Sequence, residues 1–276
     1  MAFRLVCFAL LSFSISVNSA TAQSIFEDAN LEKVVRQYVF EKRNNDQPIT
    51  AKDVENISTI EGKAMGVKNL KGLENCLSLA LLDLEGNEIE DISAIKELKR
   101  IQSLNLKANK IADISSVAGL TGLQYLQLAD NQITDIKPLE GLENLRSLYL
   151  SNNKIKEIAS VAKLGKLWSL YLDGNPIGDF GPVSELTKIS TLDLTSTGIS
   201  DLKPLMPLSE LKYLILQNNK ITDIGILVEK AKTDRAGDNR FALFWRIYLA
   251  GNPLSEDAKT KQAKSLKETG GKLFLE

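Results

Sequence analysis

Residues 79–92 read LALLDLEGNEIEDI, and residues 101–114 repeat the same frame as IQSLNLKANKIADI. The shared pattern is L-x-x-L-x-L-x-x-N-x-I-x-x-I, and further copies begin at residues 123, 145, 167, 189 and 211. One such unit cannot bury its apolar side chains alone. The copies must therefore stack into a solenoid around one continuous apolar core.

This frame is that of a leucine-rich repeat. Its L-x-x-L-x-L part predicts a short strand in every copy, in which positions one, four and six point into the core and positions three, five, seven and eight point outward. The predicted fold class is α/β. It is a right-handed leucine-rich-repeat solenoid with a curved parallel β-sheet on the concave side, short helices or 3-10 turns on the convex side, and a helical N-terminal cap.

Residues 1–22 predict a signal peptide. Arg4 precedes a short apolar stretch, Leu5 to Val17, and Ala20-Thr21-Ala22 has the small-x-small pattern of a cleavage site. The apolar stretch is too short for a lasting membrane span, and the alternative is a buried helix of the mature protein. We therefore expect a secreted or periplasmic protein without a membrane span after cleavage.

The two cysteines predict no internal disulfide in the mature chain. Cys7 is lost with the signal peptide, and Cys76 falls on an inward position of a degenerate first repeat. A buried cysteine of this kind behaves as a small, inert core residue. Stability must then come from the stacking of the repeats.

Residues 23–56 lack the repeat and predict two helices that cap the solenoid. Asp28 would begin the first, whose apolar stripe includes Tyr38, and Thr50 would begin the second, with Asp53 as a weaker partner in its capping box.

Residues 57–254 hold about nine repeats. They include the degenerate first copy, with Met65 at the asparagine position, and a last copy that starts at Phe244 after a charged insertion near residues 228–241. Residues 255–276 predict a C-terminal cap, made of one helix and a last apolar strand.

The asparagine of the frame predicts a hydrogen-bonded ladder where the chain leaves each strand. An amide can donate to and accept from the unpaired backbone groups of that turn. Thr197 interrupts this ladder, which predicts a softer junction between its repeat and the neighbouring one. The acidic residue four positions after each asparagine position is expected to cap a short convex helix. The ladder residues are Asn87, Asn109, Asn131, Asn153, Asn175 and Asn219, and the acidic residues are Asp91, Asp113, Asp135, Glu157, Asp179, Asp201 and Asp223.

Composition argues against several functions. The net charge is −1 and no histidine occurs, so the chain lacks the basic excess of nucleic-acid-binding proteins and the commonest general base and metal ligand. Asp83 and Glu85 resemble a glycosidase carboxylate pair, but an open sheet face would not raise the pKa of either. We predict no catalysis, no cofactor, no metal and no nucleic-acid partner.

Five of the six tyrosines fall on the predicted outer face of the sheet. Strands lie about 4.8 Å apart, so Tyr149 and Tyr171, at position five of neighbouring repeats, should be adjacent. Tyrosine and tryptophan are enriched at binding hot spots, although aromatic residues also support sheets through cross-strand pairs. The predicted partner-binding residues are Leu81, Tyr125, Tyr149, Trp168, Tyr171, Asp193, Tyr213, Ile215 and Tyr248.

Other side chains complete the predicted outer face. Trp168 shares position two, near the sheet edge, with Trp245. Lys107 matches Glu85 in the preceding repeat and Lys110 matches Glu88, which predicts two cross-strand ion pairs.

The recurrent N-x-I-x-D-I, as in residues 131–136, resembles internalin-type bacterial leucine-rich repeats. The resemblance extends to the Ile25-Phe26-Glu27-Asp28 segment and the amphipathic helix after it, and covers about residues 24–254. It implies a bacterial binding module that uses its concave face. Internalins commonly continue into an immunoglobulin-like domain and a wall-attachment signal, which are absent here, so a host-invasion role is not carried over.

The sequence thus predicts an exported, non-catalytic, monomeric repeat protein that binds another protein on its concave face. The alternative is a structural or envelope-assembly component that has no defined high-affinity partner.

Removal of residues 1–22 is the first testable outcome. The intact mass of the exported protein should correspond to a chain that begins at Gln23, because the small-residue site ends at Ala22. Recovery of the full-length chain from the cytoplasm would contradict both the cleavage and the assigned compartment.

Overall fold

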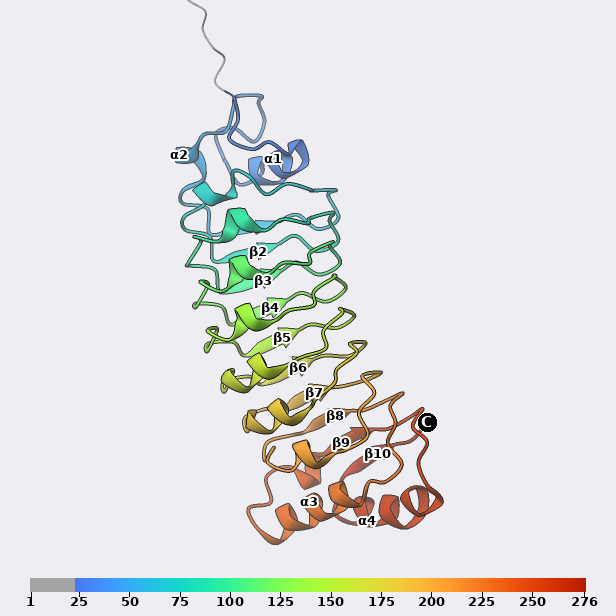
Figure 1. The fold of residues 1–276 in the computed structure, drawn as a ribbon. Helices are drawn as coiled ribbons and strands as arrows, with labels where there is room; N and C mark the ends of the chain where they lie inside the picture. The colour runs from blue at the N-terminus through green and yellow to red at the C-terminus, as the bar shows by residue number, and fades with distance from the viewer. Residues whose placement is uncertain (1–22) are drawn as a thin grey trace, which may run out of the picture.

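The computed structural model describes residues 23–276, so the predicted signal peptide and Cys7 lie outside the described residues. Ten short strands form one parallel sheet in the order β1 to β10, and most of the short helices lie on the opposite side of the stack (Figure 1). The predicted leucine-rich-repeat solenoid is confirmed. The strands are β1 (Thr59–Glu61), β2 (Leu81–Asp83), β3 (Ser103–Asn105), β4 (Tyr125–Gln127), β5 (Ser147–Tyr149), β6 (Ser169–Tyr171), β7 (Thr191–Asp193), β8 (Tyr213–Ile215), β9 (Arg246–Tyr248) and β10 (Lys272–Phe274).

The convex side is made of 3-10 helices, one for most repeats, and is widened by an α-helix near the C-terminus. The 3-10 helices are η1 (Leu73–Asn75), η2 (Ser93–Ile95), η3 (Ser115–Val117), η4 (Lys137–Leu139), η5 (Ala159–Lys163), η6 (Gly181–Glu185), η7 (Lys203–Leu205) and η8 (Ala242–Phe244). The α-helices are α1 (Ala29–Arg36), α2 (Ala51–Val54), α3 (Gly225–Ala236) and α4 (Ala263–Glu268), and the π-helical segment η9 (Ala258–Gln262) leads into α4.

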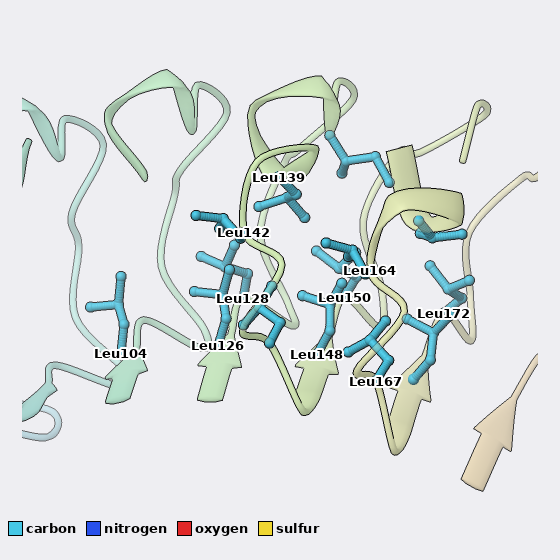
Figure 2. Packing of buried hydrophobic residues seen from close by; sticks show 14 of the residues in the cluster. Leu104, Leu126, Leu128, Leu139, Leu142, Leu148, Leu150, Leu164, Leu167 and Leu172 are labelled. Carbon is cyan, nitrogen blue, oxygen red and sulfur yellow. The ribbon is translucent and has the colours of Figure 1, made fainter. Parts of the chain in front are cut away.

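The strand register repeats without offset from β1 to β8. Leu104 pairs with Leu126 and Leu126 pairs with Leu148, so each core side chain lies beside its counterpart 22 residues away. These leucines are fully buried between the sheet and the 3-10 helices (Figure 2). Positions one, four and six point inward as predicted, because only that alternation buries the leucines of the frame on one side of the sheet.

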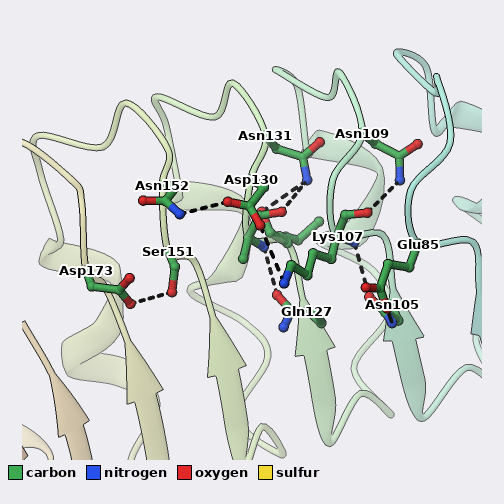
Figure 3. A network of polar contacts seen from close by, with 12 residues as sticks. Glu85, Asn105, Lys107, Asn109, Gln127, Asp130, Asn131, Ser151, Asn152 and Asp173 are labelled. Carbon is green, nitrogen blue, oxygen red and sulfur yellow. Dashed lines mark hydrogen bonds and ion pairs between the residues drawn. The ribbon is translucent and has the colours of Figure 1, made fainter.

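The asparagine ladder is present. The Asn131 amide nitrogen donates to the carbonyl oxygens of Leu106 and Leu128 at 3.0 and 3.1 Å, and its side-chain oxygen accepts from the backbone nitrogen of Ile111 at 3.0 Å. Figure 3 shows Asn109 and Asn131 in this arrangement. Each asparagine therefore ties its own turn to the preceding repeat.

Thr197 interrupts the ladder as predicted, and a proline one repeat earlier accompanies it. Pro176 has no N–H to donate to the preceding repeat, whereas the Lys154 nitrogen, at the equivalent position, donates to the Ile133 carbonyl oxygen. The Ile177 nitrogen, which an asparagine at position 197 would accept from, donates instead to the Asn175 carbonyl oxygen at 3.0 Å. The local turn has thus replaced the bond that the threonine cannot make.

Six of the seven acidic residues after the ladder cap a convex turn, as predicted, whereas Glu157 accepts no such hydrogen bond within residues 23–276. Asp91 accepts from the backbone nitrogen of Ser93 at 2.7 Å, and Asp135 accepts from that of Lys137 at 2.7 Å. Each of these bonds satisfies an N–H group at the start of the helical turn that follows, which would otherwise lack a partner.

Cys76 is fully buried, and burial raises the pKa of its thiol to about 12. A thiol with such a pKa stays protonated near neutral pH and is a poor nucleophile. The structure agrees with the predicted role as an inert core residue.

The segment before the repeats contacts the first coil through its predicted caps. Asp28 accepts from the backbone nitrogens of Asn30 and Leu31, and its second oxygen accepts from those of Lys68 and Asn69 at 2.7 and 3.1 Å. Asp53 completes the capping box with Thr50 despite being the shorter acid. We propose that residues 23–56 are the N-terminal cap, since α1 and α2 lie over the end of the stack (Figure 1).

Tyr38 was predicted on the apolar stripe of the first helix, but α1 ends at Arg36 and Tyr38 is partly exposed. Its hydroxyl oxygen accepts from the backbone nitrogen of Glu61 at 2.9 Å, so the side chain binds the edge of β1 instead of the core.

The phase of the last repeat was predicted correctly, since Ile247 and Leu249 are buried at its inward positions, but its first position was assigned to the wrong aromatic residue. Phe244 was expected to point inward and Trp245 to lie at the sheet edge, but Phe244 is 63% exposed and Trp245 is 0% exposed. The insertion forms α3, whose Lys230 and the following Phe241 pack together, and the Phe241 ring meets the Trp245 ring edge-on at 5.0 Å. The added helix α3 takes the place of an ordinary convex turn. Beside it the Trp245 indole is buried, and the Phe244 ring is exposed.

Asn131→Ala should lower the free energy of unfolding by about 2–3 kcal/mol, because it leaves buried backbone groups of two repeats without partners. Chemical denaturation measures the change. Asn144→Ala is the control, since the exposed Asn144 also donates to a backbone carbonyl, that of Thr121, and should cost within about 0.5 kcal/mol. Equal losses for the two variants would contradict the importance of the ladder.

Candidate functional site

Three tyrosines form a contiguous aromatic cluster at the centre of the concave face. The Tyr149 and Tyr171 rings stack at 4.7 Å between centroids with an interplanar angle of 13°, and the Tyr125 ring lies 5.4 Å from that of Tyr149 at 47°. All three are half-buried. The predicted adjacency of Tyr149 and Tyr171 is correct, because β5 and β6 pair these residues directly.

The cluster continues into a mixed row at position five. Register places Asp193 beside Tyr171, Ile215 beside Asp193, and Tyr248 beside Ile215. Phe274 on β10 then stacks on Tyr248 at 4.4 Å and 7°. Phe274 was missed because the register of β10 lies beyond the repeat frame, although an apolar last strand had been predicted.

Other predicted residues lie apart from this row. Leu81 is on β2, separated from Tyr125 by Ser103 in the position-three row. Tyr213 packs under the Arg246 guanidinium, 5.3 Å from its ring centroid. Trp168 is 67% exposed and precedes β6 at the edge of the sheet. The structure therefore joins most, but not all, of the predicted binding residues.

Position three beside the cluster carries small side chains. Ser147, Ser169 and Thr191 lie in register between Tyr125 and Tyr213. Each of these residues has a hydroxyl group and little bulk, so the two rows differ in height where Tyr149 and Tyr171 stack. A side chain from a partner could rest on the serines against the tyrosine rings.

Asp193 stands out electrostatically within the row. Burial raises the pKa of its carboxyl group above the ordinary value, and the nearby Asp173 acts in the same direction, whereas hydrogen bonding to Thr195 opposes the rise. Within residues 23–276, Asp193 has no ion-pair partner closer than 4.0 Å. Burial likewise raises the pKa of Tyr125 and Tyr171, so their phenols stay neutral and can donate.

In the N-terminal part of the concave face, polar side chains of neighbouring repeats bind one another (Figure 3). The predicted Lys110–Glu88 ion pair is present at 2.9 Å. The predicted Lys107–Glu85 pair was wrong, because Lys107 lies 3.6 Å from Asp130 and Glu85 binds Lys63 at 2.9 Å. Lys63 belongs to the degenerate first repeat and competes for the same carboxylate.

Asp83 and Glu85 share one cation. Lys63 lies 3.3 Å from Asp83 and 2.9 Å from Glu85, and this contact lowers the pKa of Glu85. A general acid needs a raised pKa, whereas the pKa of Glu85 is lowered. Over the described part of the chain no group of three His, Cys, Asp or Glu residues could hold a metal ion, and no helix is long and apolar enough to cross a membrane.

Family models and solved structures agree on the class of protein. The model described as Leucine Rich repeats (2 copies) matches residues 121–163, and that described as Leucine Rich repeat matches residues 209–228. A search of curated proteins found no match.

The solved structures that are similar to this chain include the following three. Internalin C2 from Listeria monocytogenes is 35% identical with a TM-score of 0.69, over 74% of this chain and 89% of that chain. The internalin InlF from Listeria monocytogenes is 23% identical with a TM-score of 0.53, over 93% and 92%. A leucine-rich-repeat protein from Leptospira interrogans is 22% identical with a TM-score of 0.58, over 73% and 56%.

The last two matches show the shared fold alone, whereas internalin C2 shares sequence over most of both chains. Its 35% identity over 89% of its length, together with the 22-residue repeat register from β1 to β8, places this chain in the family of internalin-type bacterial leucine-rich-repeat proteins.

Proposed function

We propose that this protein is an exported, non-catalytic leucine-rich-repeat protein that binds another protein on its concave face. The observation that carries the proposal is the stacked pair of Tyr149 and Tyr171 with Tyr125 beside it. Contiguous, half-exposed tyrosine rings provide large contact area at low entropy cost, which is typical of binding hot spots.

The charge beside the tyrosines indicates what the partner presents. Asp193 and Asp173 flank Tyr171, and burial raises the pKa of Asp193 in the free protein. A lysine or arginine of the partner could pair with Asp193 while lying against the tyrosine rings, where cation–π attraction adds to the ion pair. The partner surface is therefore expected to be basic at this contact.

The alternative is a structural or envelope-assembly component. In such a protein we expect the charged residues of the concave face to be paired within the chain itself. The polar contacts at the N-terminal part of the face are satisfied internally, as for Glu85. The unpaired Asp193 offers no such internal bond beyond its own turn. A purely structural role does not account for a partly buried carboxylate that lacks an ion-pair partner. The environment of Asp193 therefore favours a binding role.

A photo-crosslinking residue tests where a partner binds before the partner is known. A photo-crosslinking residue in place of Ser147, between the tyrosines, should yield a defined crosslinked species in the exported fraction. Replacing Glu140, on the convex side directly after η4, should not. Crosslinks of equal yield from both positions would contradict concave-face binding.

Changing Tyr149 and Tyr171 together to serine should weaken binding of the crosslinked partner by several kcal/mol, since hot-spot truncations cost about 2 kcal/mol or more each. The free energy of unfolding should fall by only about 1 kcal/mol, the worth of a cross-strand pair. Titration calorimetry and denaturation measure the two quantities. Phe40→Ser, which removes an aromatic ring that is 76% exposed on another surface, is the control. A folded double variant that binds normally would identify the tyrosines as sheet supports.

Asp193→Asn should stabilise the free protein at neutral pH and weaken binding of a basic partner. The raised pKa of Asp193 in the folded state means that the native state holds this proton more tightly than the unfolded state, so the contribution of Asp193 to stability decreases as pH rises from the ordinary carboxyl range through the raised pKa. The variant's advantage should vanish in acid below that range. Denaturation midpoints against pH measure it. Asp83→Asn, at the same position on β2, is the control and should not stabilise, because it loses the ion pair with Lys63. A stability difference between variant and wild type that does not grow as pH rises through this window would contradict the assignment.

A further inference from the structure

A groove of about 640 Å³ runs along the sheet edge where the strands begin. No residue of the tyrosine cluster or of the position-five row lines it. It spans the approach to β2 through that to β6, which is roughly 19 Å at the spacing of parallel strands. Lys99, Arg100, Arg146 and Lys166 supply its charged groups. Because these residues precede the strands or occupy position two, they fall outside the outward positions that the repeat frame identifies.

The charges of this basic edge groove are largely uncompensated. No carboxylate lines the groove. Among the four cations, in the portion of the chain that the structure describes, only Lys99 has an ion-pair partner, Glu97 at 3.4 Å outside the groove lining. Arg100 donates to the Ser78 hydroxyl at 3.4 Å and Lys166 to the Asn144 side-chain oxygen at 2.8 Å, both neutral acceptors. Four exposed cations thus line one groove in a chain whose net charge is −1.

The neutral residues of the groove distinguish between anionic ligands. Gln102 and Gln124 lie between the arginines, at the same position of successive repeats. Each amide both donates and accepts hydrogen bonds. Inorganic polyphosphate offers acceptors only and cannot donate to the glutamine oxygens, whereas a peptide also offers backbone N–H groups. Arginine forks moreover match carboxylates in bidentate geometry.

We propose that the basic edge groove binds an extended acidic peptide segment of a protein partner. About six extended residues span the groove, at roughly 3.3 Å per residue. Their carboxylates pair with Arg100, Arg146 and Lys166, and their backbone groups bond to the two glutamines. The groove is a second surface, separate from the tyrosines, and its occupant needs no contact with them.

The test uses a fluorescein-labelled ten-residue peptide with glutamate at alternate positions and serine or glycine between, measured by fluorescence anisotropy at low salt. The wild-type chain should bind it at least tenfold more tightly than the same peptide with glutamine for glutamate. Affinity should fall steeply as salt increases, because the contacts are exposed ion pairs. The charge-reversed double variant Arg146→Glu with Lys166→Glu should bind at least tenfold more weakly.

The matched control is Lys154→Glu with Lys156→Glu, which makes the same change in net charge within an adjacent part of the solenoid, away from the groove. It should change the affinity by less than about threefold, and unchanged thermal midpoints should accompany both variants. The double variant of Tyr149 and Tyr171 should bind the peptide normally, so that failure of the concave proposal and failure of this one are distinguishable.

Three results would overturn the proposal. The first is no binding of the glutamate peptide at low salt, and the second is equal weakening by both charge-reversed variants, which would indicate bulk electrostatics. The third is tighter binding of a short inorganic polyphosphate than of the peptide, which would identify a general polyanion site. If Arg146→Glu with Lys166→Glu unfolds, Arg146→Gln with Lys166→Gln replaces it, with the same expected direction.

Discussion

The hydrogen bonds that each ladder asparagine makes to the preceding turn hold the whole arrangement in register. Where the chain leaves a strand, backbone groups lose their sheet partners, and burying them unpaired is costly. Asn131 meets this need for its own turn and the one before it. Because equivalent turns are tied in this way, equivalent side chains lie one strand apart over most of the sheet. The stacked Tyr149 and Tyr171, the buried leucines and the edge groove all follow from that alignment.

Much of the fold could be predicted because the repeat couples sequence position to direction in space. The inward leucines, the ladder and the tyrosine pair each depend only on counting within 22 residues. Where the count is broken, prediction fails: α3 interrupts the period, and Trp245 replaces Phe244 in the core. The partner of Lys107 was also mistaken, because a degenerate repeat supplied Lys63, a competing cation that no regular frame identifies.

The two candidate surfaces differ in how visible they are from sequence. The tyrosines lie at positions that alternate with the core and could be assigned directly. The edge groove depends on the approach to each strand, where the path of the backbone decides which side chains converge, and its four cations are scattered over positions 99 to 166. Asp193 could be placed on the face, but its desolvation depends on neighbours from other repeats. Burial and charge compensation are properties of the assembled sheet.

Pro176 and Thr197 have a consequence for how such a chain can change in length. A solenoid whose repeats are equivalent can lose or duplicate 22 residues without disturbing the joints on either side. These two residues belong to consecutive repeats, yet they solve one problem together: the turn after Asn175 bonds locally, and the next turn no longer needs an amide. A recombination event that separated them would join an ordinary turn to a threonine, or this altered turn to an asparagine. The two repeats that contain Pro176 and Thr197 should therefore be inherited together, as one unit of 44 residues. Exchange of single repeats within the gene should not separate them.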